Sequence, residues 1–473
     1  KYTVGFNKFT KYLNGDTDGV IKNAEWASQI TGLSSDAIFD LIKEIKESKR
    51  TMISISWSLT RQSHGEQPYW AAIALASIIG DIGKPGGGIG FGYSAMNSIG
   101  DHYKKIPAVS LPQGKNSVKK FIPVARISEM LESPGTSFDY NGSKLTYPDI
   151  KLIYWVGGNP FHHHQDLNRM IKAWQLPETI ISHEWCWNAL AKHSDIVLPV
   201  TTPLEREDIA LAPRDPYMVF MSKIIDPIGM SKSDFEIFSD LAEKFNIRKK
   251  YTENRTEQEW IKWIYDESNA LQETNHKFPD FDVFKKKGWY KHPKPIDHQI
   301  FLREFIESPL KNPLDTPSGK IELFSKKIDS FQYSDCVGHP KWYGDKEYLG
   351  NASKYKLHLL SNQPKFKLHS QLDQGKVADG EKSDGRAIIE VNIRDAEARD
   401  LSEGALVRVF NDRGSCLAVI KISKDIMQGV VNIPTGAWLD PSKSDSISCV
   451  HGNPNVLTLD AGTSKLAQGP SSH

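Results

Sequence analysis

The ten residues from Gly157 to Asp166 read GGNPFHHHQD, and the three consecutive histidines His162, His163 and His164 raise the question of a metal site. Imidazole nitrogen is a common metal ligand in proteins. Neighbouring residues of a helix point about 100° apart, however, so three in a row do not converge on one ion. The run therefore favours a hydrogen-bonding role for His163, and solvated side chains at the start of a helix for His162 and His164.

The residues on either side of the histidines predict a site for an anion or a nucleotide. The pattern KLIYWV, residues 151–156, is typical of a buried strand, and Gly158 after it lets a ligand approach the backbone closely. A proline follows Asn159 at the first position of a helix, whose N–H groups are unpaired. Glu184 ends the next predicted strand, where dinucleotide-binding folds place an acidic residue on a ribose hydroxyl. The turn departs from G-x-G-x-x-G, which disfavours a standard nicotinamide or flavin site.

A second group of polar residues follows another predicted strand, RTMISISWS. Trp57, Arg61 and His64 come just after this strand, on the side of a sheet where α/β proteins bind ligands. An arginine in such a loop is often only solvated, and the glycines of KPGGGIGFG, residues 84–92, are explained by helix termination and close packing. Two strand ends that present polar side chains to one crevice nevertheless favour nucleotide binding.

The elements that must position these residues fall into three predicted regions. Strands alternate with helices over residues 1–230, which indicates an α/β region with an open, mainly parallel sheet and helices on both faces. Residues 231–350 are rich in Lys, Glu and aromatics and predict a helical excursion and a connector. Residues 351–473 contain short β-type runs separated by Gly, Asn and Asp turns, which predicts a barrel-like domain.

The composition excludes several classes of protein. Lys and Arg number 59 against 58 Asp and Glu, so bulk charge indicates no nucleic-acid or membrane partner. The longest apolar run, residues 71–80, is far shorter than the roughly 18 residues that suggest a membrane span. The four cysteines are too far apart for a metal knuckle and too few for a disulfide framework. The first residue is Lys1 and the opening looks like the inside of a domain, so we expect a piece of a longer protein that lacks the N-terminal part.

Six strings of residues resemble one enzyme family. They are GGNPFHHHQDLNRMIKAW, HEWCWNALAKHSDIVLPVTTPLERED, TPSGKIELFS, SNQPKFKLHSQLD, VRVFNDRG and HGNPNVLTLDAGTSKLAQG. The chain is similar, from its first residue to its last, to the molybdopterin oxidoreductases of the dimethyl sulfoxide reductase family. The similarity is greatest to the branch of biotin sulfoxide reductase and trimethylamine N-oxide reductase.

The resemblance implies a bis(molybdopterin guanine dinucleotide) molybdenum cofactor held between the α/β region and a C-terminal six-stranded β-barrel. In the α/β region it implies cofactor contacts, including a guanosine pocket and its phosphates, from Trp57, Arg61, Gly158, Asn159, His163, Gln165, His183, Glu184, Arg206 and Asp234. In the barrel it implies contacts to pterin edges from His369, Ser370, Gln371, Asn453, Asn455 and Gln468. Many members of the family have Asp where this chain has Glu184, so the contact would need a longer reach. HGNPN is also a strong turn sequence, so turn chemistry is the alternative for the two asparagines.

The implied reaction is the two-electron reduction of an S-oxide or N-oxide, of the biotin sulfoxide, trimethylamine N-oxide or dimethyl sulfoxide type, by oxygen-atom transfer to Mo(IV). In this branch a serine from an upstream segment ligates molybdenum, and nothing in residues 1–473 matches that segment. No catalytic residue or metal ligand is therefore assigned, and we expect this piece to be inactive by itself. We also expect it to stop before the short strand that would close the barrel.

Two alternatives remain open. Another molybdopterin enzyme, of the formate dehydrogenase or nitrate reductase type, would use a different metal ligand. A non-catalytic nucleotide-binding α/β module would need no pterin at all. The sequence leaves open the electron donor, the oligomeric state and the compartment. Membership of the biotin sulfoxide branch would imply the cytoplasm, and membership of the N-oxide branch the periplasm. Any iron–sulfur cluster would also lie upstream, since no CxxCxxxC pattern occurs here.

Overall fold

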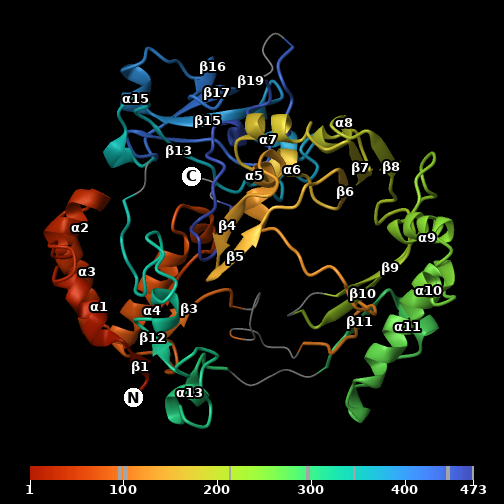
Figure 1. Cartoon of the computed structure of the whole chain (residues 1–473), viewed down its shortest axis with the longest axis horizontal. Coiled ribbons are helices and arrows are strands. Elements are labelled where there is room, and N and C mark those ends of the chain that lie inside the picture. Colours follow the sequence, from red (N-terminus) through yellow and green to blue (C-terminus); the bar gives the residue numbers. More distant parts are fainter. Residues whose placement is uncertain are drawn as a thin grey trace.

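The computed structural model describes residues 1–93, 99, 105–211, 215–293, 299–344, 347–443 and 448–470. Figure 1 shows the C-terminal sheet (blue) beside the unit of β6, β7 and β8 (residues 152–199, yellow to olive). The N-terminal helices (red) and the helices α9 to α11 (residues 234–270, green) lie on opposite sides of the view. None of the described helices is long and apolar enough to cross a membrane.

The strand and helix pattern after residue 150 folds into parallel βαβ units, as predicted. The strands β6 to β8 form a three-stranded parallel sheet with β7 in the middle. In chain order the elements are β6 (Leu152–Val156), α6 (Pro160–His163), α7 (Leu167–Ala173), β7 (Thr179–Glu184), α8 (Ala189–Lys192) and β8 (Ile196–Pro199). The carboxyl ends of β6 and β7 are in register, with Val156 opposite His183, so the two loops that follow them start at one edge.

The first predicted strand belongs to a separate parallel pair. β2 (Met52–Ser54) pairs with β3 (Gly88–Gly90), and the 3₁₀ helix η1 (Trp57–Arg61) and α4 (Glu66–Ile79) connect them. The α/β class is therefore confirmed, but the parallel strands β2, β3 and β6 to β8 form two small sheets and not one. The strands are too short, at three to six residues, for sequence pattern to specify which strands are neighbours.

The start of the chain packs against a segment much later in the sequence. β1 (Thr3–Val4) pairs in parallel with β12 (Ile321–Glu322), which lies in the predicted connector. The helices α1 (Phe6–Leu13), α2 (Ala24–Thr31) and α3 (Ser35–Glu47) follow, and α3 has no buried residue. The predicted boundaries at residues 230 and 350 stay a prediction.

The middle of the chain is largely helical. Its helices are α9 (Asp234–Lys244), α10 (Arg248–Thr252), α11 (Glu257–Ala270), α12 (Phe281–Lys287), α13 (Arg303–Glu307) and α14 (Lys326–Asp329). Capping boxes begin α9 and α11, at Ser233 with Glu236 and at Thr256 with Glu259. An antiparallel sheet of β9 (Asp208–Leu211), β10 (Tyr217–Met221) and β11 (Trp289–Lys291) packs beside them. A hairpin of β4 (Ser137–Tyr140) and β5 (Ser143–Thr146) follows α5 (Ile127–Glu132) earlier in the chain.

The C-terminal region is β-rich, as predicted, and forms a curved seven-stranded sheet where six strands were expected. The order along its hydrogen-bonded path is β13-β18-β15-β17-β16, with β14 on β15 and β19 on β17. The elements are β13 (His358–Leu360), β14 (Lys382–Ser383), β15 (Arg386–Asn392), α15 (Ile393–Glu397), β16 (Leu406–Phe410), β17 (Ser415–Ser423), β18 (Val430–Asn432) and β19 (Ser448–Cys449). The strands β14 and β19 have only two residues each, so they show no alternating pattern from which the sequence could predict them. In the described part of the chain the path ends at β13 and β16 without joining them.

One apolar core joins the β6–β8 unit to the C-terminal sheet. Phe161 and Leu190 of the first pack in the same cluster as Ile420 and Val456 of the second. Trp174, 2% exposed, belongs to this cluster, and its ring meets that of Phe161 edge-on with ring centres 5.4 Å apart. Its indole N–H also donates to the carbonyl of residue 193 at 3.0 Å.

Replacing Trp174 by alanine should lower the free energy of unfolding by about 3–5 kcal/mol, because it leaves a large cavity and an unpaired carbonyl. Chemical denaturation followed by circular dichroism measures the change. The matched control is Trp187→Ala, since that side chain is 72% exposed and should change stability by less than about 0.5 kcal/mol. Equal losses in the two variants would contradict the assignment of Trp174 to the shared core.

Candidate functional site

The turn after β6 has a backbone that its two glycines make possible. Gly157 and Gly158 both have left-handed φ values, 77° and 72°, which favour glycine. Asn159 then caps α6 by accepting a hydrogen bond from the N–H of residue 161 at 3.1 Å. The apolar spacing of residues 161–174 predicts one continuous helix, but the segment forms two. Asp166, at φ 40°, interrupts the helix and caps α7 by accepting a hydrogen bond from the N–H of residue 169.

The three histidines point into three different surroundings. The His162 ring is 3% exposed and stacks on Trp438 with ring centres 4.9 Å apart. Nε2 of His164, 2% exposed, lies 3.3 Å from a carboxylate oxygen of Asp460. The prediction of solvated rings at 162 and 164 is wrong, because the core shared by the two regions covers both. In the described ranges no group of three or more His, Cys, Asp or Glu side chains is arranged to hold a metal ion.

His163 is the exposed member of the run and faces positively charged neighbours. Desolvation by the surrounding protein lowers its pKa, and the positive groups nearby, including His369 and Arg61, lower it further. These neighbours come from three separate parts of the chain: η1, the GGNP turn (residues 157–160) with its histidines, and the LHSQ loop (residues 368–371). A neutral His163 at pH 7 keeps one nitrogen as a donor and one as an acceptor.

Five buried polar atoms near this turn have no hydrogen-bond partner among the described residues. They are Asn159 Nδ2, His162 Nε2, His164 Nε2, Gln165 Oε1 and, on β7, Ser182 Oγ. Each such atom costs about 1–3 kcal/mol when it is left unpaired. Amide, imidazole and hydroxyl groups together suit a ligand with several donors and acceptors on one edge. The chemistry of this donor set therefore fits a purine or pterin. Motif reasoning missed Ser182, which shows no signal beyond its place in a strand.

Glu184 ends β7 as a buried carboxyl. It is 7% exposed and accepts a hydrogen bond from the side-chain amide of Asn188 at 2.7 Å. Burial raises the pKa of Glu184 to about 7, although the Asn188 bond acts in the opposite direction. The carboxyl can therefore either donate or accept a hydrogen bond near neutral pH.

His183 is held by protein groups on both sides of its ring. Nε2 lies 2.8 Å from the hydroxyl of Tyr154, and Nδ1 lies 2.7 Å from a carboxylate oxygen of Asp234 at the start of α9. The structure thus brings the predicted site residues His183 and Asp234 together, and their side chains contact each other. Arg206 pairs with Asp208 and lies near α11. Trp57, 45% exposed, lies edge-on to Phe91.

The LHSQ loop is fixed to the stack of His162 and Trp438. The indole N–H of Trp438 donates to the carbonyl of Ser370 at 2.7 Å, and its backbone N–H donates to Asp373 at 3.1 Å. A Cβ on Gly436 would lie 2.0 Å from the carbonyl oxygen of His369, so only glycine fits there. The side chains of His369 and Gln371 remain exposed.

The three predicted amides near the C-terminal end contact protein groups. Asn453 and Asn455 donate from Nδ2 to the carbonyls of Phe161 and His162, at 3.4 and 3.2 Å. Gln468 accepts from Nε of Arg126 at 2.8 Å and donates to the carbonyl of residue 139 at 2.9 Å. The two asparagines therefore fix the α6 turn in place, and Gln468 fixes the β4 hairpin.

Two family models match the chain. The model described as "Molybdopterin oxidoreductase" matches residues 24–244, and that described as "Molydopterin dinucleotide binding domain" matches residues 357–473. Both contain parts of the site built above, since the GGNP turn lies in the first and the LHSQ loop in the second.

Several characterised proteins are similar to the chain over its whole length. It is 44% identical to a biotin sulfoxide reductase of Cereibacter sphaeroides, covering 100% of this chain and 63% of that protein. It is 42% identical to a dimethyl sulfoxide/trimethylamine N-oxide reductase of Rhodobacter capsulatus, covering 99% and 59%. It is 40% identical to a trimethylamine-N-oxide reductase of Haemophilus influenzae, covering 100% and 60%. The chain thus spans about three fifths of the length of these relatives.

A solved structure shares the fold. Acetylene hydratase from Pelobacter acetylenicus superposes with a TM-score of 0.66 at 17% identity, over 97% of this chain and 63% of that one. The two family models and the relatives show that residues 24–244 form a molybdopterin oxidoreductase domain and residues 357–473 a molybdopterin dinucleotide-binding domain.

Proposed function

We propose that the complete protein reduces an S-oxide or N-oxide with a bis(molybdopterin guanine dinucleotide) molybdenum cofactor, and that residues 1–473 supply much of the cofactor's binding surface. The observation that carries the proposal is the uninterrupted similarity to enzymes named for biotin sulfoxide, dimethyl sulfoxide and trimethylamine N-oxide. The unpaired buried atoms around the GGNP turn support it independently.

The residues of the turn would hold the guanosine end of the cofactor. Asn159 Nδ2 and Gln165 Oε1 offer one donor and one acceptor, which matches the alternating edge of guanine. Gly157 and Gly158 leave the backbone open on one side, since a Cβ on Gly157 would meet nothing within 4 Å. Glu184, at the end of the neighbouring strand, would bind ribose hydroxyls. The bound cofactor would supply the two-electron oxygen-atom transfer chemistry, which no side chain can supply.

Other predicted residues would act by positioning. His183 would orient the end of β7 through its bonds to Tyr154 and Asp234. Asn453 and Asn455 would hold the carbonyl side of α6, so that its unpaired side chains face the ligand. Arg61, His163 and His369 would line the crevice, where their positive or neutral character suits phosphate and pterin oxygens.

The first test is the composition of the complete protein, expressed from its whole gene in a host that makes the cofactor. We expect about one molybdenum and about two guanine nucleotides released by acid for each chain, as this class of cofactor requires. Cells grown without molybdate provide the control. Protein that contains neither metal nor guanine would contradict the proposal, and a full complement without reduction of any S-oxide or N-oxide would favour another molybdopterin chemistry.

A second test concerns the buried carboxyl. Because the pKa of Glu184 is raised to about 7, the folded protein binds more protons than the unfolded chain between about pH 4.3 and pH 7. Stability therefore falls as the pH rises through this range. The variant Glu184→Gln removes this penalty, so cofactor-free protein should gain up to about 3 kcal/mol above pH 7 and much less at pH 5.

Urea midpoints at pH 5 and pH 8 measure the difference. Glu178→Gln is the matched control, because that side chain, just before the opposite end of β7, is 73% exposed and its substitution should leave stability unchanged at both pH values. A gain for Glu184→Gln that does not depend on pH would contradict the assigned titration.

A further inference from the structure

One buried carboxylate binds three separate segments beside the proposed cofactor crevice. The side chain of Asp373, two residues after the LHSQ loop, is 4% exposed. It pairs with the ammonium group of Lys367, just before the loop, and with that of Lys382 on β14, whose nitrogen lies 3.0 Å from Oδ1. Its other oxygen, Oδ2, accepts a hydrogen bond from the backbone N–H of Trp438 at 3.1 Å. These four residues are called the Asp373 cluster below.

The Asp373 cluster places two cations on one anion inside the protein. The side chains of Lys367 and Lys382 are only 7% and 10% exposed, and a buried charge is costly unless it is paired. Burial acts to raise the pKa of Asp373, but its bonds to Lys367, Trp438 and Lys382 outweigh burial, so that the pKa is lowered. The carboxyl is therefore charged at neutral pH. Its loss would leave two buried ammonium groups without their carboxylate.

The LHSQ loop needs such an anchor because its backbone is strained. His369 and Leu372 have left-handed φ values, 50° and 52°, which residues other than glycine rarely adopt. Strained residues keep this conformation only where the surrounding structure imposes it. The side chains of His369 and Leu372 are both exposed, so their own packing does not impose it. The contacts that do so hold their neighbours: Trp438 donates to the carbonyl of Ser370 and to Asp373.

Trp438 extends the effect of the Asp373 cluster to α6, the helix after the GGNP turn. Its indole ring stacks on that of His162, with ring centres 4.9 Å apart. Burial is the main cause of the lowered pKa of His162, and the charges of Asp373 and Lys367 also act on it. The same tryptophan therefore contacts the LHSQ loop through hydrogen bonds and α6 through its ring.

We infer that Asp373 is a positioning residue, whose carboxylate holds the LHSQ loop and, through Trp438, α6 in one fixed arrangement. The inference deepens the proposed function and rests on it in one respect, since both segments would then contact the cofactor. The coupling between the two segments does not depend on which ligand binds there.

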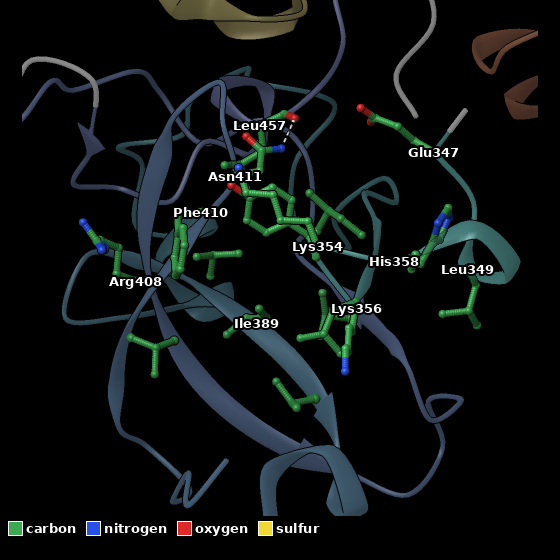
Figure 2. A pocket seen from close by; sticks show the side chains of 18 of the residues that line it. Glu347, Leu349, Lys354, Lys356, His358, Ile389, Arg408, Phe410, Asn411 and Leu457 are labelled. Atoms are coloured by element: carbon green, nitrogen blue, oxygen red, sulfur yellow. Dashed lines mark hydrogen bonds between the residues drawn. The ribbon is translucent and has the colours of Figure 1, made fainter. Parts of the chain in front are cut away.

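The C-terminal region offers a matched control in Asp395. This carboxyl is 6% exposed and also binds an N–H and a cation, since it accepts from the N–H of Gly429 at 2.5 Å and pairs with Arg399 at 3.2 Å. Arg399 lines a groove of about 800 Å³, whose described lining residues include none of the LHSQ loop or of α6. Figure 2 shows this groove, which Ile389 and Phe410 border. Loss of the Asp395 charge should therefore lower stability without loosening the two segments.

Hydrogen exchange of peptides from the complete protein, purified from cells grown without molybdate, tests the coupling. In Asp373→Asn we expect residues 366–374 to exchange roughly tenfold faster, and residues 157–166 at least about threefold faster, than in the unsubstituted protein. Asp395→Asn should leave both peptides unchanged. Unchanged exchange of residues 157–166 in Asp373→Asn would overturn the inference.

Lysine variants keep this test decisive if Asp373→Asn does not fold. Lys367→Met leaves one cation on the carboxylate, which balances the buried charge, and should speed exchange of the same two peptides. Lys367→Arg keeps the ion pair and should restore slow exchange. Equal exchange in these two variants would count against the inference.

Retention of the cofactor separates positioning from general stability. In protein from cells grown with molybdate, we expect Asp373→Asn to lose molybdenum about tenfold faster than Asp395→Asn, each held at the same interval below its own thermal midpoint. Equal rates of loss would show that Asp373 acts through stability alone and would overturn the inference. If the unsubstituted protein contains no molybdenum, the proposed function fails, while the exchange measurements still decide whether Asp373 couples the two segments.

Discussion

The site depends on two side-chain amides that reach from the C-terminal part of the chain to the carbonyls of α6. Asn453 and Asn455 bind the backbone of Phe161 and His162, about 290 residues earlier, at positions that are themselves buried. A helix of four residues makes one intrahelical turn and is not stable by itself. The GGNP turn therefore keeps its shape only while the C-terminal sheet is docked on it. The apolar cluster around Phe161 and Trp174 supplies the energy of that docking, and the two amides supply its register.

This arrangement explains why polar atoms stay unpaired so close to a well-packed core. The backbone carbonyls of α6 accept hydrogen bonds from side chains of the C-terminal region. By contrast, Asn159, His162 and Gln165 each keep one buried side-chain atom without a hydrogen-bond partner among the described residues. A packed interior tolerates such atoms when a ligand completes their bonds, because the cost of leaving them unpaired is then removed on binding.

The sequence predicted the α/β class, the strand, turn and helix at residues 151–163, and the β-rich end, because each depends on local periodicity and on Gly and Pro positions. It did not predict the break at His164 to Asp166, since Asp166 in a left-handed conformation leaves no signal in a helical pattern. The partners of His183 and Gln468 lie far away in sequence, so no local pattern could identify them. The burial of His162 and His164 was missed for the same reason, because the covering residues, Trp438 and Asp460, come almost 300 positions later. The roles assigned to the cofactor-binding residues stay a prediction.

The three consecutive histidines show how position decides chemistry for one residue type. Burial against Trp438 lowers the pKa of His162 to about 4, so at pH 7 this ring is neutral and one of its nitrogens can accept a hydrogen bond. Nε2 of His164 lies beside the carboxylate of Asp460 but forms no hydrogen bond among the described residues, and His163 alone of the three is exposed toward Arg61 and His369. A single cationic cluster would bind any anion, with little selection for shape. Here one ring is neutral and buried, one lies beside a carboxylate and one is exposed, so together they present a fixed pattern of donors and acceptors. Such a pattern is required to discriminate between a nucleotide and a simple phosphate.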